Sequence, residues 1–463
     1  LTAEDYVYSI KRLADPENRS PSANFIRGKI VGLDAQIQKA KKTGKFDYDA
    51  PVAGLQATDR YTLRIRLNAP DSNFLYVLAY GALAAVSKEA VNAYGSKIGS
   101  HPVGTGPYML EEYVPRSKVV LVANPNYRGF IWDFKSTGSA WDEQLVREMK
   151  GKKMPQVGRV EISIIEEEQS RWLSFQEGRI DFDKLPQLAA PVALDGNSLK
   201  PDLAEQGIRL YRTTEPEVTY TIFNMKDPVT GGYGKEKIAL RRAIAMSYNT
   251  QAEIALLRNG QATKAQMIVP PGVVGHDPSY RSSIAYEPEL AARLLDHFGY
   301  KKGADGYRRM PDGSPLVLKI RTEANASSRV ISEIRAEFEV GNFADNVKDA
   351  TGCRLMMWGG AWHADYPEGE NFMQLLYGPN AGQGNHGCYQ SKAFDKLYRQ
   401  AVKLPPGKAR DRLYVQMNRQ MEADTAWSVH VSRTRNWLVR PWVMGFKKHP
   451  ILLSDWQYLD VSK

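Results

Sequence analysis

The sequence predicts a mixed α/β protein (α/β or α+β) built from at least two domains, and three observations support this prediction. The chain has 463 residues, whereas a single hydrophobic core stops growing at about 250 to 300 residues. Its composition, 43% hydrophobic and 25% charged, is that of ordinary globular proteins and far from that of disordered chains. Short strand-like segments alternate with amphipathic helical segments throughout, which is typical of these two fold classes.

Strands are predicted where apolar residues alternate or run together over a short distance. The segment 61–67 alternates apolar and polar residues with period two, as a half-buried strand requires. Further strands are predicted at 119–122, 160–165, 218–223 and 316–320. Helices are predicted where apolar residues recur every three or four positions, namely at 290–298, 394–401 and 413–421.

The first residues predict the start of a helix, with Thr2 as its N-cap and Asp5 completing a capping box. No initiating Met and no apolar signal-peptide core stands at this opening, so we expect an N-terminal portion of the protein to precede it. The longest apolar run, 74–86, is shorter than the roughly 20 residues that a membrane helix needs. We therefore expect no transmembrane anchor in this sequence.

The net charge of +10 is scattered along the chain and does not form a basic tail or an arginine stripe. A nucleic-acid-binding surface needs clustered cations with stacking groups between them. We therefore expect no nucleic-acid partner, and we interpret the mild basicity as a contribution to solubility.

The chain contains two cysteines, Cys353 and Cys388. They are either two buried thiols or one disulfide formed in an oxidising compartment. The disulfide is the favoured interpretation, since no third cysteine competes for either partner. In the chain-entropy model a bridge across a loop of this size contributes about 3 to 4 kcal/mol.

No complete catalytic or metal-binding motif is present. The glycines of 101–108 lack the Lys-Ser/Thr of a phosphate-binding loop, and no Gly-x-Ser-x-Gly occurs. His363, Asp365, His386 and Cys388 match neither HExxH nor paired CxxC spacing, so we expect no metal site and no cofactor. Sequence spacing does not exclude the two facing carboxylates of a glycosidase. An extracellular hydrolase is therefore the alternative from the enzyme class.

The segment 356–367 is the most informative part of the sequence. A strand-like apolar run leads into Trp358 and Trp362, and Asp365 follows just before Pro367. An acid among aromatic rings is costly unless it is paired, and a ligand ammonium is a natural partner. The alternative interpretation is a capping aspartate beside core tryptophans.

Several segments taken in chain order resemble the family 5 extracellular solute-binding proteins of ABC transporters, which include dipeptide- and oligopeptide-binding receptors. The match runs along essentially the whole chain. The segments that carry it are 1–9, 102–108 (Pro-Val-Gly-Thr-Gly-Pro-Tyr), 124–127, 178–181, 223–224 with 240–244, and 362–367.

The resemblance implies a periplasmic-binding-protein-like fold with two lobes, two crossover strands and a hinge that closes on the ligand. Residues 1–103 would be the remainder of a small extra domain of lobe one, whose N-terminal part we expect to be missing. Residues 104–222 with 438–463 would form the core domain of lobe one, and residues 223–437 would form lobe two. A helix that the family usually places near 328–338 is not apparent in the sequence.

The resemblance also implies a function. We expect a monomeric binding protein, not an enzyme, that is periplasmic or tethered outside the cytoplasm by a lipid. It would capture short peptides and deliver them to the membrane permease subunits of an ABC importer. The same scaffold binding another solute, such as an opine, a metal chelate or an oligosaccharide, is the alternative, because fold does not determine ligand.

By position, Asp365 matches the acid that holds the ligand's α-ammonium in peptide-binding members of the family. Trp362 and Tyr366 would form the walls of that pocket, and Tyr220 and Asn224 are further cleft candidates on the strand that enters lobe two. Some oligopeptide-binding members have a basic residue where this chain has Gly359.

Overall fold

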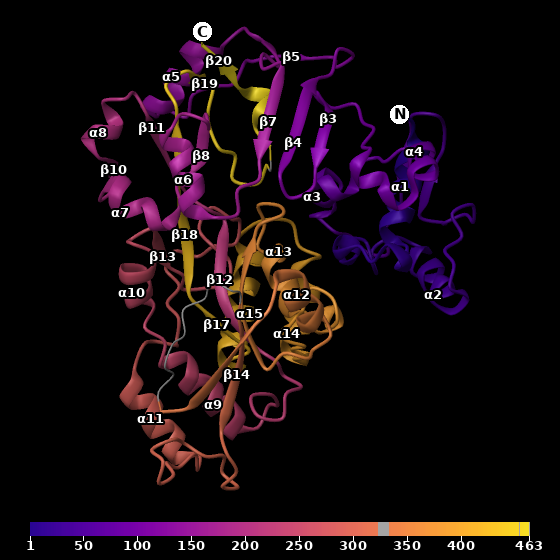
Figure 1. The fold of residues 1–463 in the computed structure, drawn as a ribbon. Helices are drawn as coiled ribbons and strands as arrows, with labels where there is room; N and C mark the ends of the chain where they lie inside the picture. The colour runs from indigo at the N-terminus through magenta and orange to yellow at the C-terminus, as the bar shows by residue number, and fades with distance from the viewer. Residues whose placement is uncertain (323–332, 453, 463) are drawn as a thin grey trace.

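The structure, a computed structural model, describes residues 1–322, 333–452 and 454–462. Three regions are visible along the chain (Figure 1). We call residues 1–103 the N-terminal region, residues 104–214 with 440–462 the first lobe, and residues 217–430 the second lobe. Residues 215–216 and strand β18 (Val431–Val439) cross between the two lobes. Among the described residues no helix is long and apolar enough to span a membrane.

The N-terminal region is helical with one small hairpin. The predicted capping box is present, because the backbone N–H of Thr2 donates to the Asp5 carboxylate at 2.6 Å. The predicted strand at 61–67 is shorter in the structure, because the Asp59 side chain accepts the N–H groups of Tyr61 and Thr62 and holds that part of the segment in a turn. The elements are α1 (Ala3–Ala14), α2 (Leu33–Thr43), β1 (Leu55–Ala57), β2 (Leu63–Ile65), α3 (Phe74–Ala79) and α4 (Lys88–Tyr94).

One sheet lies wholly in the first lobe; it has the order β3-β4-β7 and includes the strands predicted at 119–122 and 160–165. A second sheet, of order β11-β18-β13, joins the two lobes: β11 and β8 of the first lobe pair with the crossing strand β18, and β13 belongs to the second lobe. The elements are β3 (Tyr108–Val114), β4 (Lys118–Ala123), β5 (Phe130–Ile131), α5 (Ala140–Met149), β6 (Lys153–Met154), β7 (Arg159–Ser163), α6 (Glu168–Gln176), β8 (Phe182–Lys184), α7 (Ala190–Ala193), β9 (Leu194–Asp195), β10 (Ser198–Leu199), α8 (Pro201–Ala204), β11 (Arg209–Thr214), β19 (Val443–Met444) and β20 (Asp460–Val461).

The second lobe is built on a five-stranded mixed sheet of order β15-β14-β16-β12-β17, and helices cover it. The predicted strands at 218–223 and 316–320 are β12 and β14, and the three predicted helices are α11, α14 and α15. The elements are β12 (Glu217–Phe223), α9 (Lys235–Met246), α10 (Thr250–Ala252), β13 (Ala262–Lys264), α11 (Pro288–His297), β14 (Val317–Thr322), β15 (Arg335–Val340), α12 (Phe343–Thr351), β16 (Met357–His363), α13 (Glu370–Met373), α14 (Lys392–Ala401), α15 (Lys408–Asp424) and β17 (Trp427–Val429).

The segment 328–338, where the family places a helix, lies partly outside the described residues. From Arg335 onward it forms β15, which pairs in parallel with β14 through the register Val317↔Arg335 to Thr322↔Val340. The described part of this segment is therefore an edge strand of the second lobe.

The crossover between the lobes is a narrow, charged junction. β18 pairs with β11 through Arg435↔Thr213 in the first lobe and with β13 through Arg433↔Ala262 toward the second. Glu217, at the start of β12, already pairs with β16, so the chain enters the sheet of the second lobe before the predicted boundary at 222/223. The three predicted domain ranges remain predictions.

The predicted disulfide between Cys353 and Cys388 is confirmed; it joins two cysteines 35 positions apart within the second lobe. We expect the double variant Cys353→Ser/Cys388→Ser to lose about 3 to 4 kcal/mol of unfolding free energy, because the unfolded chain regains the entropy of the open loop. Urea denaturation measures this loss. Wild-type protein treated with a reductant should match the double variant, and equal stability of all three samples would contradict the expectation.

Candidate functional site

Asp365 lies just beyond the C-terminal end of β16, at the contact between the second lobe and the N-terminal region. Its carboxylate Oδ2 accepts a hydrogen bond of 2.9 Å from the Asn371 side chain. The Tyr80 side chain, from the N-terminal region, also hydrogen-bonds this carboxylate. The half-buried Asp365 is therefore held between two regions of the chain.

Asn371 fixes the geometry around Asp365. This residue is fully buried, and its Oδ1 atom accepts hydrogen bonds from the Asp365 backbone N–H and from Nε1 of Trp362, both at 3.0 Å. Its Nδ2 atom donates to the Asp365 carboxylate. One amide thus orients the acid and the indole ring together, so both are held in place before a ligand arrives.

The electrostatic environment of Asp365 is unusual for a carboxylate. Burial raises its pKa above the ordinary value, although hydrogen bonds from Asn371 and Tyr80 and the positive charge of His363 act in the opposite direction. Within the described ranges, no Lys or Arg forms an ion pair with Asp365. A cationic group placed against this carboxylate would therefore meet an acid that lacks a strong partner.

The strand that leads to Asp365 has one free edge. β16 pairs with β12 along its whole length, but its pairing with β14 covers only Met357 and Trp358. In the described chain no strand pairs with the other edge beyond Trp358, and Gly359 and Ala361 are exposed. Because backbone groups in an antiparallel ladder alternate between the two edges, this stretch presents unpaired N–H and C=O groups directly before Asp365.

The comparison with known families identifies the chain. A family model described as bacterial extracellular solute-binding proteins, family 5 Middle, matches residues 1–384. The chain belongs to this family. Its members are solute-binding proteins of ABC transporters.

Individual relatives of this family 5 protein are distant but cover nearly all of it. The periplasmic oligopeptide-binding protein OppA of Salmonella typhimurium is 24% identical over 454 residues, which span 96% of this chain and 76% of that protein. Heme-binding protein A of Haemophilus influenzae is 24% identical over 440 residues, spanning 92% and 71%. The solved structure of OppA from Burkholderia pseudomallei has a TM-score of 0.77 at 19% identity and covers 100% of this chain and 84% of that one. The predicted two-lobed α/β fold is confirmed.

Tyr366 follows Asp365 in the chain, and its side chain contacts other residues. Its ring stacks on Tyr76 with 6.0 Å between centroids, packs edge-on against Phe25, and its hydroxyl donates to the buried Glu370 carboxylate. The side chain therefore joins the second lobe to the N-terminal region of the family 5 protein. Its role as a pocket wall remains a prediction.

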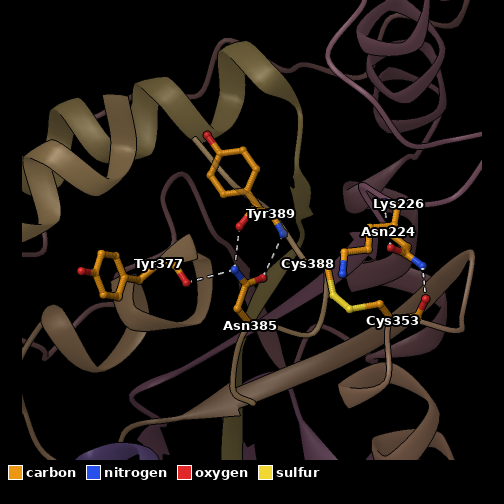
Figure 2. Close-up of a disulfide and its surroundings, with 7 residues drawn as sticks. All are labelled: Asn224, Lys226, Cys353, Tyr377, Asn385, Cys388 and Tyr389. Carbon is orange, nitrogen blue, oxygen red and sulfur yellow. Dashed lines mark hydrogen bonds between the residues drawn. A yellow bond between two sulfur atoms is a disulfide. The ribbon is translucent and has the colours of Figure 1, made fainter. Parts of the chain in front are cut away.

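Tyr220 and Asn224 lie on and just after β12, inside the second lobe. The Tyr220 ring is buried and stacks on Trp427 at 3.8 Å between centroids. Asn224 is also buried; its side chain donates to the carbonyl of Cys353 at 2.8 Å and accepts the Lys226 N–H at 3.0 Å, beside the disulfide (Figure 2). The structure thus groups Asp365 with Trp362 and places the other two inside the lobe, so their ligand-binding role remains a prediction.

Residues of the site that sequence reasoning missed are Asn371, Tyr80 and His363. Asn371 follows Asp365 by six positions with no motif to mark it, and Tyr80 is distant in sequence. The sequence marks His363 only as a candidate metal ligand, whereas in the structure it lies opposite Glu217 in the β12–β16 ladder and its imidazolium form would lower the pKa of Asp365.

Proposed function

We propose that this family 5 protein is an extracytoplasmic receptor that captures short peptides between its lobes and delivers them to the permease subunits of an ABC importer. It acts in the periplasm, or tethered to the membrane by a lipid, as a monomer. The observation that carries the proposal is Asp365, a half-buried carboxylate held by Asn371 and Tyr80 with no Lys or Arg ion pair in the described chain. A peptide α-ammonium would supply the missing charge.

The free edge of β16 supports an extended ligand. A peptide backbone that adds to this edge would pair with the unpaired groups of 359–363, and main-chain pairing gives affinity without reading side chains. Gly359 has no atom within 4 Å of the position that a Cβ would occupy, so a ligand backbone could approach closely there. The strand then leads the N-terminal end of the peptide to Asp365.

The relatives favour peptides but also keep the alternative open. Their names give an oligopeptide as the ligand of one and heme as the ligand of another. Heme carries no ammonium group to pair with Asp365. The acid therefore favours peptides over heme, a metal chelate or an oligosaccharide as the ligand of this chain, whereas an opine, which also has a protonated amine, stays the alternative.

Calorimetric titration with defined peptides tests the proposal. We expect peptides with a free α-ammonium to bind and their N-acetylated forms to bind much more weakly, and the ligand should be recovered chemically unchanged. Heme and a neutral oligosaccharide serve as comparison ligands. Binding of one of these with no binding of any peptide would overturn the proposal, and recovery of cleaved ligand would favour the hydrolase alternative.

The affinity for peptides should depend on pH through Asp365. Burial raises the pKa of this carboxyl in the free protein, whereas a bound ammonium would lower it, so the peptide binds the ionised form. Lowering the pH through the raised pKa should then weaken binding by up to about tenfold per pH unit. The weakening should begin above the pH at which an ordinary aspartate titrates. Fluorescence titrations at a series of pH values measure this, and an unchanged Kd from neutral pH down to the ordinary aspartate range would contradict it.

A further inference from the structure

A cluster of charged residues surrounds the crossover on the side of the first lobe. Three of its cations are arginines, and each has a carboxylate partner: Arg171 pairs with Asp183 at 2.9 Å, Arg435 pairs with Glu215 at 2.9 Å, and Arg433 pairs with Glu217. The fourth cation, Lys184, ends strand β8.

Lys184 has no carboxylate partner of its own. Within the described residues its ammonium forms no ion pair and no hydrogen bond, although Arg435, Glu215, Arg171 and Arg433 all lie close enough to act on its charge. The cluster therefore holds four cations against the three acids that pair with its arginines. Such a surplus of like charge is unfavourable unless an anion offsets it.

The Lys184 ammonium remains open to a ligand. The side chain is half-buried, but its Nζ atom reaches solvent. Burial lowers the pKa of Lys184, which is consistent with an ammonium that is partly stripped of water and not neutralised. Lys184 lies opposite Trp437 in the pairing of β8 with β18, the strand that crosses between the lobes (Figure 1).

A row of charged groups connects this position with Asp365. His363 acts on the charge of Asp365 and lies opposite Glu217 in the β12–β16 ladder. Glu217 in turn pairs with Arg433 on β18. Lys184 lies opposite Trp437, which is four residues farther along β18 than Arg433. Four strand residues span about 13 Å along β18. The acid and the free ammonium thus lie on opposite sides of the crossover, at the two ends of this row of charged groups.

We propose that Lys184 is the anion-recognising residue of the ligand site and that it binds an acidic side chain of the solute. A peptide that follows β16 from Asp365 toward Gly359 runs into the second lobe, so its α-carboxylate would lie away from Lys184. This inference rests on the proposed peptide-binding function and adds a preference for acidic peptides. Asp365 fixes the positive end of the ligand, and Lys184 fixes the negative group. A charge-assisted hydrogen bond of this kind is stronger than a neutral one.

Three versions of one peptide of about three to five residues test the proposal: a free C-terminus, a C-terminal amide, and the amide with a glutamate side chain added. Wild type should bind the glutamate-bearing amide about tenfold or more tightly than the neutral amide. Lys184→Met, and equally Lys184→Gln, should bind all three with similar Kd. A wild type that prefers only the free C-terminus, with that preference lost in Lys184→Met, would overturn the assignment to a side chain.

Two control variants separate this proposal from the peptide-binding function. Lys150→Met removes the same charge from an exposed site in the first lobe and should keep the wild-type preference. Asp365→Asn should weaken all three peptides while keeping their ratio. A Lys184→Met variant that keeps the preference, or a wild type that shows none, overturns the role of Lys184 alone. Failure of wild type to bind any peptide overturns both proposals.

Thermal unfolding distinguishes ligand recognition from a structural role. Because Lys184 lies among like charges without an ion pair, Lys184→Met should keep or raise the melting temperature. A melting temperature well below that of wild type in both Lys184 variants would show that the ammonium stabilises the fold and would overturn the proposal.

Discussion

Asp365→Asn is expected to weaken peptide binding by about 2 to 5 kcal/mol while leaving the fold intact. The variant keeps the shape of the side chain, and Asn371 and Tyr80 can still hydrogen-bond the remaining oxygen. What it removes is the charge that would face the α-ammonium in a half-buried position. The ligand ammonium would then be desolvated without a counter-charge, which costs more than the lost hydrogen bond.

A double-mutant cycle with the ligand isolates this interaction. N-acetylation removes the ammonium from the peptide, so the acetylated peptide should bind wild type and Asp365→Asn with nearly the same Kd. Circular dichroism and thermal unfolding should show that the variant is folded. If Asp365→Asn lowers the affinity for free and acetylated peptides equally, the acid shapes the site and does not hold the ammonium.

Much of the fold could be predicted because it depends on local patterns. The short apolar segments that became β4, β7, β12 and β14 carry their strand signal within a few residues, and the capping box at Thr2 and Asp5 spans four positions. Cys353 and Cys388 could be paired because no other cysteine was present.

The local geometry of the candidate site could be predicted only in part, because it depends on contacts between distant segments. Asp365 could be found from its aromatic neighbours and from the resemblance. The alternation of β12 directs the Tyr220 ring onto Trp427 in the core, a contact that the sequence does not indicate, and the ligand-binding role of Tyr220 remains a prediction. Tyr80 comes from another region of the chain, and the pattern of residues within one segment does not predict its hydrogen bond to Asp365.

The contact between the N-terminal region and the second lobe was also missed in the sequence. Asn73, on the N-terminal side, donates to Glu368 at 3.0 Å across 295 positions, and the fully buried Arg410 forms an ion pair with the same carboxylate at 2.8 Å. Lys29 pairs with Asp71 at 2.8 Å beside this network. In the sequence each of these residues looks like an ordinary exposed polar residue. They are buried or half-buried because the surface of the N-terminal region packs against that of the second lobe.

The buried pair leads to the other large expected effect. Arg410→Met should lower the free energy of unfolding by about 3 to 5 kcal/mol, because Glu368 would keep its charge in a buried site without its cation. Hydrogen bonds to Glu368 from Tyr414 at 2.8 Å and from Asn73 would remain, but neither brings a positive charge. Urea denaturation at neutral pH measures the loss.

The double variant Arg410→Met/Glu368→Leu is the matched control, and it should recover much of this loss because no buried charge is left unpaired.

The loss of unfolding free energy in Arg410→Met should also depend on pH. Burial raises the pKa of Glu368 to about 6 even in the presence of Arg410, and removing the guanidinium should raise it further. Protonation below that pH makes the acid neutral in the folded state, so the Arg410→Met defect should shrink as pH falls from 8 to about 5. Arg410 also donates a hydrogen bond of 3.2 Å to Oδ1 of Asn73. A defect that is the same at both pH values, or a double variant as unstable as the single one, would show that Arg410 stabilises the contact through packing and this hydrogen bond, and not by neutralising Glu368.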